Sequence, residues 1–122
     1  MYDILLVKGI LSQIENACET VIHRFSTIKT VSDFTDSPSG KEKLDSICMQ
    51  LFAIGESLKN IDKITDFKLL SKYTDVDWKG AKGMRDIISH HYFDIDAEEI
   101  YYVCENKIDE MKEVIHQIII EL

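Results

Sequence analysis

The chain has 122 residues, which is enough for one domain with a buried core and leaves no room for two. Apolar residues make up 45% of the sequence and charged residues 30%, and this mixture excludes both a disordered chain and a collagen-like one. The formal net charge of −8 argues against a general nucleic-acid-coating protein, because an acidic surface repels phosphates.

The first two predicted helices follow from apolar residues that recur every three or four positions. In the first segment these residues are Ile4, Val7, Leu11, Ile14, Cys18, Val21, Ile22 and Phe25. Residues 26–40 collect Ser, Thr, Asp, Gly and the only Pro, which predicts a connection. The second helix is expected to begin near Ser39 and to bury Leu44, Ile47, Cys48, Leu51, Ile54, Leu58 and Ile61. Gly55 interrupts this helix at a cost of about 1 kcal/mol relative to Ala, which indicates a compensating close helix contact.

The remaining sequence predicts three more helices. A short one is expected over about 62–73, and another follows Asp75-Val76-Asp77, where either Asp can cap it, and runs to about Tyr92. Asp96 can cap the last helix, whose apolar stripe is Ala97, Tyr101, Cys104, Ile108, Met111, Ile115, Ile118 and Leu122. The predicted fold is therefore all-α: one domain over residues 1–122, built as an up-and-down bundle of four main helices and one short helix.

The cysteines and the hydropathy of the chain predict the cellular environment of the protein. Cys18, Cys48 and Cys104 each lie on an apolar stripe and form no CxxC pair, so we expect reduced core thiols rather than zinc ligands. No apolar run approaches the ~18 residues of a membrane span, and residues 1–11 lack the basic start and cleavage site of a signal peptide. We therefore expect a soluble, cytoplasmic protein with no membrane partner.

One segment, residues 84–92, concentrates the side chains that could do chemistry. Asp86 and His90 are four apart and share a helix face, so the carboxylate could orient the imidazole. Arg85 and His90 are about 140° apart around a helix and do not converge. Either the helix ends near His90, or the two groups cooperate across a two-fold dimer. Just before this segment lies an acid-free basic stretch with Lys79 and Lys82, which are candidate contacts for a phosphate.

These residue types suit cleavage of RNA without a metal. An imidazole, with an ordinary pKa near ~6.5, can take the proton of a ribose 2′-OH at neutral pH. A guanidinium can hold the phosphate and the negative charge that grows in the transition state. DNA lacks the 2′-OH, so this mechanism would select RNA. The structural alternative is that the Arg is a solvated charge and the His interacts only with the last carbonyls of its helix.

Other readings of this region are weaker. Four side chains lack a recognised zinc spacing, which argues against a metal site: His90, His91, Asp94 and Asp96. Ser89 and His90 are helix neighbours that point apart, so they do not form part of a catalytic triad. Tyr101-Tyr102 is expected to pack in the core or a dimer interface rather than to stack on bases.

Residues 85–92 resemble the Arg-x4-His-x-Tyr motif of the HepT-type toxins, which belong to the HEPN superfamily of small helical RNases. The similarity covers nearly the full chain. It includes residues 53–56 (Ala-Ile-Gly-Glu), the run from Trp78 to Asp86, and residues 92–96. The resemblance implies a HEPN homodimer in which both Arg-His motifs face one cleft. Arg85 and His90 would be the catalytic pair, and Asp86 the polar residue that supports them.

The resemblance also implies a partner and a form of control. In this type VII-like toxin–antitoxin family, a minimal nucleotidyltransferase (MNT) antitoxin neutralises the toxin by transferring AMP to the motif tyrosine, here Tyr92. The implied substrate is RNA, with tRNA as one expected target, and no cofactor or metal is implied. His91 stands where relatives often have Glu, so a second imidazole lies beside the first. The alternative function is an inactive HEPN dimer that binds and regulates a nucleotidyltransferase.

Overall fold

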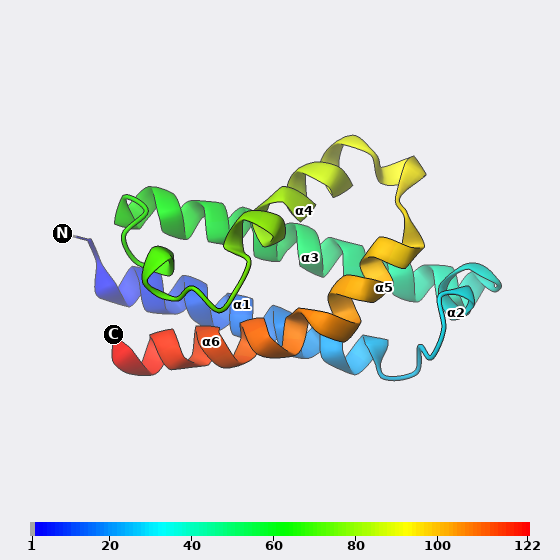
Figure 1. Ribbon diagram of the computed structural model, residues 1–122, viewed down its shortest axis with the longest axis horizontal. Coiled ribbons are helices and arrows are strands. Elements are labelled where there is room, and N and C mark those ends of the chain that lie inside the picture. Colours follow the sequence, from blue (N-terminus) through cyan, green and yellow to red (C-terminus); the bar gives the residue numbers. More distant parts are fainter. Residues whose placement is uncertain (1) are drawn as a thin grey trace.

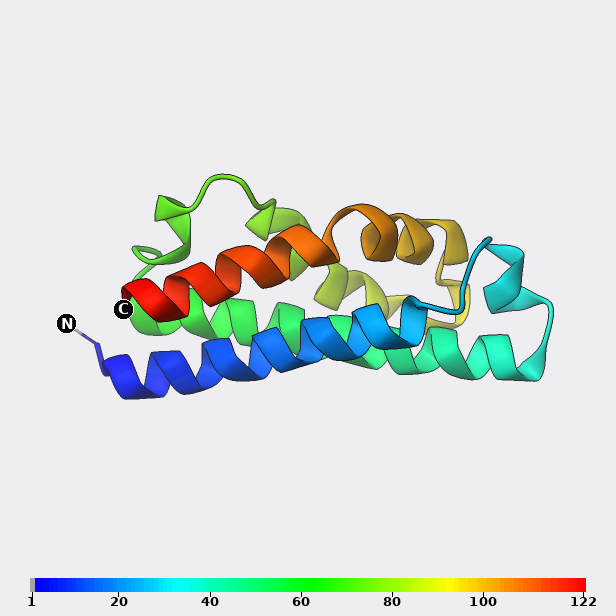
Figure 2. The same cartoon turned by 90° about the horizontal axis from the view of Figure 1, so that it is seen from below.

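The computed structural model describes residues 2–122, and every regular element within them is helical. Three helices run side by side along the long axis of the molecule: α1 (Ile4–Phe25), α3 (Pro38–Thr65) and α6 (Ile108–Glu121). The two ends of the chain lie at the same end of this bundle (Figures 1 and 2). The predicted all-α bundle is confirmed.

The shorter elements cover the sides and one end of the three long helices. Helix α4 (Trp78–His90) packs along α3, and α5 (Ala97–Asn106) contacts both α1 and α3. Helix α2 (Ser32–Thr35) lies within the predicted connection and packs against α3, where Phe34 is fully buried. Two single 3-10 turns complete the chain, η1 (Leu70–Lys72) and η2 (Tyr92–Asp94).

Side-chain caps begin four of the helices, two of them at aspartates among the candidates that the sequence indicates. The Asp3 carboxylate accepts the Leu6 N–H at the start of α1, and the Ser37 hydroxyl accepts the Gly40 N–H at the start of α3. Of the two candidate caps before α4, Asp77 is the one used, since its carboxylate accepts the Gly80 N–H at 2.9 Å. Asp96 caps α5 as predicted.

The apolar stripes of the helices meet in one continuous core. Cys18, Cys48 and Cys104 are buried in this core as free thiols, as predicted. Burial raises the pKa of Cys18 and Cys104 to about 12 and that of Cys48 to about 11, so none of them is a thiolate at neutral pH.

The helix predicted over 62–73 is wrong. Helix α3 instead continues to Thr65, and the chain then turns through two left-handed residues, Asp66 with φ 53° and Phe67 with φ 60°. The N–H groups of both residues donate to the Asp62 carbonyl, which closes the helix end. Only the 3-10 turn η1 follows, because the left-handed pair reverses the chain before a new helix can start.

The single last helix predicted from Asp96 onward is also wrong, because it is broken at Lys107 into α5 and α6. The break leaves the apolar spacing unchanged: Cys104 and Ile108, four positions apart, are buried on either side of it. Periodicity alone therefore could not reveal the bend, which lets α5 diverge from the line of α6 (Figure 1).

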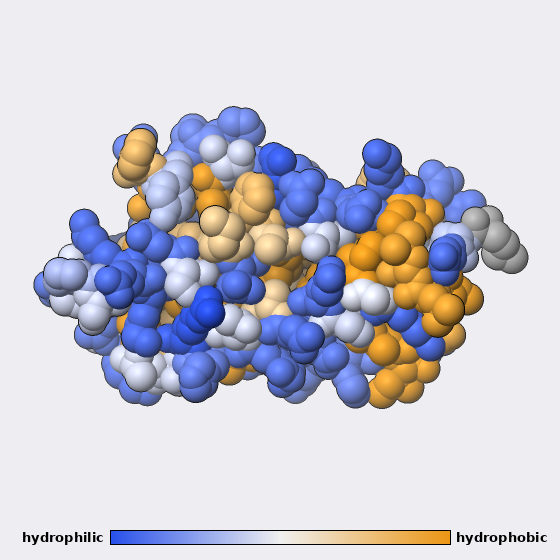
Figure 3. All heavy atoms as spheres, turned by 180° about the vertical axis from the view of Figure 1, so that it is seen from behind, coloured by the Kyte–Doolittle hydropathy of each residue, from blue (hydrophilic) through white to orange (hydrophobic). Residues whose placement is uncertain are grey.

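Besides the separate side chains of Phe67 and Tyr102, two groups of large apolar side chains are exposed. One group lies where α1 begins and α6 ends, and apolar surface gathers toward that end in Figure 3: Ile4, Leu5, Leu6 and Ile120. The other group lies around the end of α4: Met49, Ile87, Tyr92 and Phe93, with the Phe93 side chain 100% exposed. Within residues 2–122, none of the helices combines the length and the apolar character needed to cross a membrane.

Gly55 lies at a close approach between α3 and α4, which confirms the predicted close contact. A Cβ atom at this position would stand 2.6 Å from the Arg85 Cβ and 3.0 Å from the Ala81 carbonyl oxygen. Only a residue without a side chain lets the two backbones approach so closely, and the contact lies directly at Arg85.

We predict that Gly55→Ala destabilises the protein by about 1–2 kcal/mol, because overpacking outweighs the gain in helix propensity. Urea unfolding followed by circular dichroism measures this change. The matched control is Gly83→Ala in α4, where a Cβ would meet nothing within 4 Å, and which should leave stability equal or higher. A Gly55→Ala variant more stable than wild type would contradict the packing described.

Candidate active site

The Arg85 guanidinium is held in place by α3. Its Nε donates to Glu56 Oε2 at 2.6 Å, and its central carbon lies 5.3 Å from the centroid of the Phe52 ring. A hydrogen bond from Nη1 to Asp86 Oδ1 at 3.2 Å completes the arrangement. The bond to Glu56, followed by that to Asp86, raises the pKa of Arg85 further, so the group is a permanent cation. Its Nη2 takes part in no hydrogen bond with residues 2–122 and can bind an anion.

Asp86 supports the site differently from the sequence prediction. Its carboxylate accepts from Lys59 Nζ at 2.8 Å and from Arg85, and these contacts lower the Asp86 pKa, so it is ionised at neutral pH. The Asp86 carboxylate therefore binds two cations, Lys59 of α3 and Arg85 of α4. The predicted contact between this carboxylate and the His90 imidazole is absent from the structure.

His90 is oriented by a main-chain group instead. Its Nδ1 lies 2.9 Å from the Asp86 carbonyl oxygen, one helical turn earlier. Because a carbonyl oxygen can only accept, Nδ1 carries the proton of this hydrogen bond, and the neutral ring keeps its lone pair on Nε2. The His90 side chain is exposed, so Nε2 is accessible to a substrate proton.

Arg85 and His90 do not meet within one chain. Helix α4 ends at His90, but the ring remains bonded to the preceding turn, so the helix end does not redirect it toward the guanidinium. Among residues 2–122, no hydrogen bond joins the two side chains.

The two residues that follow His90 occupy a tight turn. His91 ends α4 and its exposed side chain makes no hydrogen bond with the described part of the chain. The Tyr92 side chain is 45% exposed, yet its hydroxyl donates to Asp45 Oδ1 at 2.6 Å rather than standing free in water. This bond to a carboxylate raises the pKa of Tyr92 to about 12. The phenol shares a hollow with Asp45, Met49 and Phe52, the ring that also underlies Arg85.

The two candidate phosphate contacts differ in their surroundings. Lys82 forms an ion pair with Asp62, whose side chain is almost fully buried, so much of its charge is already compensated. Lys79 is exposed and pairs with no acid in residues 2–122. Of the two, Lys79 is the better placed to meet an incoming phosphate.

Sequence reasoning missed three residues of this site: Phe52, Glu56 and Lys59, all on α3. Glu56 was within reach, because it directly follows Gly55 at the predicted close contact. Lys59 lies three positions further along the same helix face, a spacing that adds a second charged group beside α4. The partners of these charges depend on how α4 lies against α3, which no local pattern encodes.

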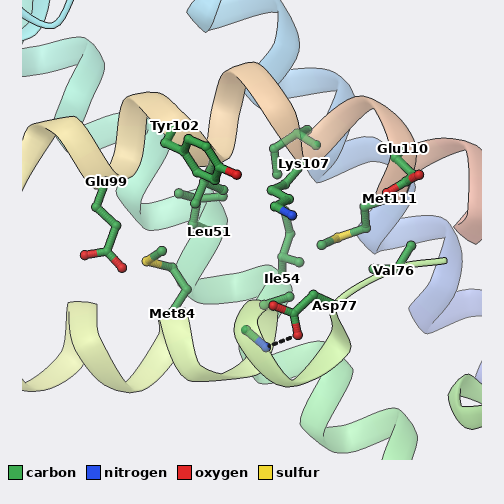
Figure 4. A pocket seen from close by; sticks show the side chains of 14 residues that line it. Leu51, Ile54, Val76, Asp77, Met84, Glu99, Tyr102, Lys107, Glu110 and Met111 are labelled. Atoms are coloured by element: carbon green, nitrogen blue, oxygen red, sulfur yellow. Dashed lines mark hydrogen bonds between the residues drawn. The ribbon is translucent and has the colours of Figure 1, made fainter. Parts of the chain in front are cut away.

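A separate, mostly apolar pocket of about 220 Å³ lies on the opposite side of α4, between α3, α4 and the α5–α6 bend (Figure 4). Leu51, Met84 and Tyr102 line it, and the Lys107 ammonium lies 5.9 Å from the centroid of the Tyr102 ring. It holds none of the predicted site residues. Tyr101 instead packs against Phe25 and its hydroxyl donates to the Lys29 carbonyl, as expected of a core residue. Within residues 2–122, no cluster of side chains is suited to hold a metal ion.

Comparison with known proteins finds relatives over most of the chain. Residues 11–118 match the family model described as “Ribonuclease HepT-like”. A “putative RNase” of Methanocaldococcus jannaschii is 35% identical over 94 residues, covering 71% of this chain and 74% of its own. One of Caldanaerobacter subterraneus subsp. tengcongensis is 30% identical over 109 residues, covering 89% of this chain and 90% of its own.

A third relative carries a second activity in its name. It is a “gamma-glutamylcyclotransferase and putative RNase” of Methanocaldococcus jannaschii, 32% identical over 116 residues. The match covers 95% of this chain and 49% of that protein, so the chain spans about half the length of this relative. No solved structure gives a significant match.

Proposed function

The chain belongs to the HepT-like ribonuclease family, and from this we propose that it is a metal-independent endoribonuclease whose catalytic pair is Arg85 and His90. The observation that carries the proposal is the hydrogen bond from His90 Nδ1 to the Asp86 carbonyl, because it leaves the lone pair of Nε2 exposed as a general base. On the same helix, the guanidinium of Arg85 is rigidly held and keeps Nη2 for an anion.

In the proposed reaction, His90 Nε2 takes the proton of a ribose 2′-OH, and the 2′ oxygen attacks the neighbouring phosphorus. The bond from phosphorus to the 5′ oxygen breaks, and that oxygen takes up a proton from water or from an imidazolium. The products are a 2′,3′-cyclic phosphate and a 5′-hydroxyl. Arg85 binds the phosphate oxygens and stabilises the charge that develops on them. No step requires a metal.

We predict RNA cleavage that persists in EDTA and leaves a 2′,3′-cyclic phosphate or its hydrolysis product. His90→Ala and Arg85→Ala should each lower the rate by at least ~100-fold, because each removes a group that acts in the transition state. His91→Ala should have a milder effect. Product analysis by denaturing electrophoresis and mass spectrometry measures this, with His116→Ala, an exposed histidine paired with Glu15 on the far side of the bundle, as the control.

Two outcomes would change the account. If His91→Ala is the inactive variant, the base is misassigned although the reaction class stands. If unmodified wild type cleaves no cellular RNA, the alternative replaces the proposal: an inactive dimer that binds a nucleotidyltransferase. The net charge of −8 favours that alternative, since it weakens unguided binding of RNA.

We further propose that the active form is a homodimer joined at the α4 end of the bundle. Arg85 and His90 lie apart within one chain, and a two-fold axis at this end would bring the Arg of one copy to the His of the other. The exposed side chains of Met49, Ile87 and Phe93 supply the apolar surface that such an interface needs.

Light scattering at micromolar concentration should accordingly give twice the chain mass of 14.1 kDa. Phe93→Glu should shift the protein toward monomers and lower cleavage in parallel, because it buries a charge in the interface. Leu5→Glu, at another highly exposed apolar position on the opposite end, is the matched control and should remain dimeric. A monomeric wild type would refute the shared site.

Control of the enzyme is proposed to act through Tyr92, by transfer of AMP from ATP by an MNT-type nucleotidyltransferase. The phenolic oxygen would attack the α-phosphorus and pyrophosphate would leave. The phenol proton would pass to Asp45, whose carboxylate accepts the hydrogen bond of the hydroxyl. The new phosphodiester would carry a negative charge beside Phe52 and Arg85, where it competes with the substrate phosphate for the guanidinium.

The test is to incubate the protein with an MNT-type nucleotidyltransferase and ATP and to measure the intact mass. One or more AMP units should be added to wild type, with loss of cleavage, because the modification blocks the phosphate site. Tyr92→Phe should remain unmodified and active. Equal labelling of wild type and Tyr92→Phe would rule out this residue as the acceptor.

A further inference from the structure

A second hollow, of about 430 Å³, lies beside the catalytic segment and has no role in the mechanism above. It is formed between the end of α3, the turn that follows α3, and the face of α4 opposite the pocket of Figure 4. Its lining residues are Lys59, Asp62, Phe67, Lys79, Lys82, Gly83 and Asp86. We call it the Phe67 hollow.

Phe67 lines this hollow in a strained backbone conformation. The residue has a φ of 60°, a left-handed conformation that suits Gly or Asn and is uncommon for an aromatic residue. Its side chain is nevertheless 64% exposed, so burial of the ring does not offset the strain. The backbone is well fixed, because the Phe67 N–H donates to the Asp62 carbonyl and the Ser71 hydroxyl donates to the Phe67 carbonyl, both at 2.9 Å.

Cations surround the exposed ring. The Lys82 ammonium lies 5.6 Å from the ring centroid and is anchored by its ion pair with Asp62. Lys79, on the same hollow, has no acid partner within residues 2–122 and is free to bind a phosphate. An exposed aromatic ring next to an unpaired lysine is the arrangement with which proteins bind single-stranded nucleic acid.

The wall formed by α4 is open and leads to the catalytic base. Gly83 costs helix stability, and a Cβ there would meet nothing within 4 Å, so packing does not explain the glycine. Lys79, Gly83, Asp86 and His90 follow one another at spacings of four, three and four, and therefore share one face of α4. Gly83 and His90 are about 10 Å apart along the helix axis, so a base in the hollow would belong to a nucleotide beyond the two that flank the cleaved bond.

We propose that the Phe67 hollow binds an unpaired nucleotide of the RNA substrate, with its base stacked on the Phe67 ring and its phosphate bound by Lys79. This subsite rests on the proposed ribonuclease function and adds to it a preference for single-stranded RNA that extends beyond the cleaved bond. A base held here fixes the strand relative to His90, while Gly83 leaves room for the base against α4.

The test measures binding separately from cleavage. The probe is a fluorescent single-stranded deoxyoligonucleotide of eight nucleotides, which can stack and bind through its phosphates but lacks the 2′-OH and so is not cleaved. Fluorescence anisotropy should show binding by wild type, and Phe67→Leu should weaken it by about tenfold, the size of one lost stacking contact. Phe67→Trp should retain the affinity.

The matched control is Tyr102→Leu, which removes another exposed aromatic ring with its own lysine contact on the other side of α4 and should bind as wild type does. Gly83→Leu gives an independent check, because its side chain should fill the hollow and abolish binding without lowering the melting temperature.

The proposal is overturned if wild type does not bind the probe, if Phe67→Leu binds it as well as wild type does, or if Tyr102→Leu weakens binding equally. Cleavage of an RNA dinucleotide, which is too short to reach the hollow, is measured in parallel. If wild type cleaves the dinucleotide and Phe67→Leu matches its rate there but has a raised KM for an RNA octamer, the subsite is supported. If wild type cleaves no RNA at all, the proposed ribonuclease function is refuted. The anisotropy measurements then decide on their own whether the Phe67 hollow binds a nucleotide.

Discussion

The close approach of α4 to α3 at Gly55 is the constraint on which the rest of the site depends. Because no side chain separates the backbones there, the Arg85 Cβ lies directly on α3, and its guanidinium reaches Glu56 and Phe52. The same packing brings Lys59 to Asp86. A wider spacing between the helices would leave the guanidinium solvated and mobile, and a mobile cation stabilises a transition state less well than a fixed one.

Helix α4 places its two candidate catalytic side chains on different faces. Arg85 faces α3, where acids and an aromatic ring hold it, whereas His90 lies on the face that includes Lys79 and Gly83. This division explains why the two candidate catalytic groups do not meet within one chain. In the proposed homodimer, each copy would supply the group that the other copy's site lacks.

The sequence was informative wherever the determinant was local. Periodicity located the long helices, Asp77 and Asp96 were recognisable as caps, and Gly55 signalled a close contact. Sequence reasoning failed where the structure depends on tertiary contacts or leaves the apolar pattern unchanged. The break at Lys107 preserves the apolar spacing, and the left-handed turn at Phe67 contains no Gly by which it could be recognised. The main-chain bond that orients His90 was equally invisible, because the residue type at position 86 suggested a carboxylate contact instead.

The central claim is that Arg85 and His90 act on one phosphate from two copies of the chain. Mixing Arg85→Ala with His90→Ala under conditions that allow subunit exchange tests this claim most directly. Half of the exchanged dimers would carry one intact pair, so the mixture should recover about a quarter of wild-type cleavage although each variant alone is inactive. A mixture that exchanges subunits, as native mass spectrometry would show, and still cleaves no RNA would contradict the account.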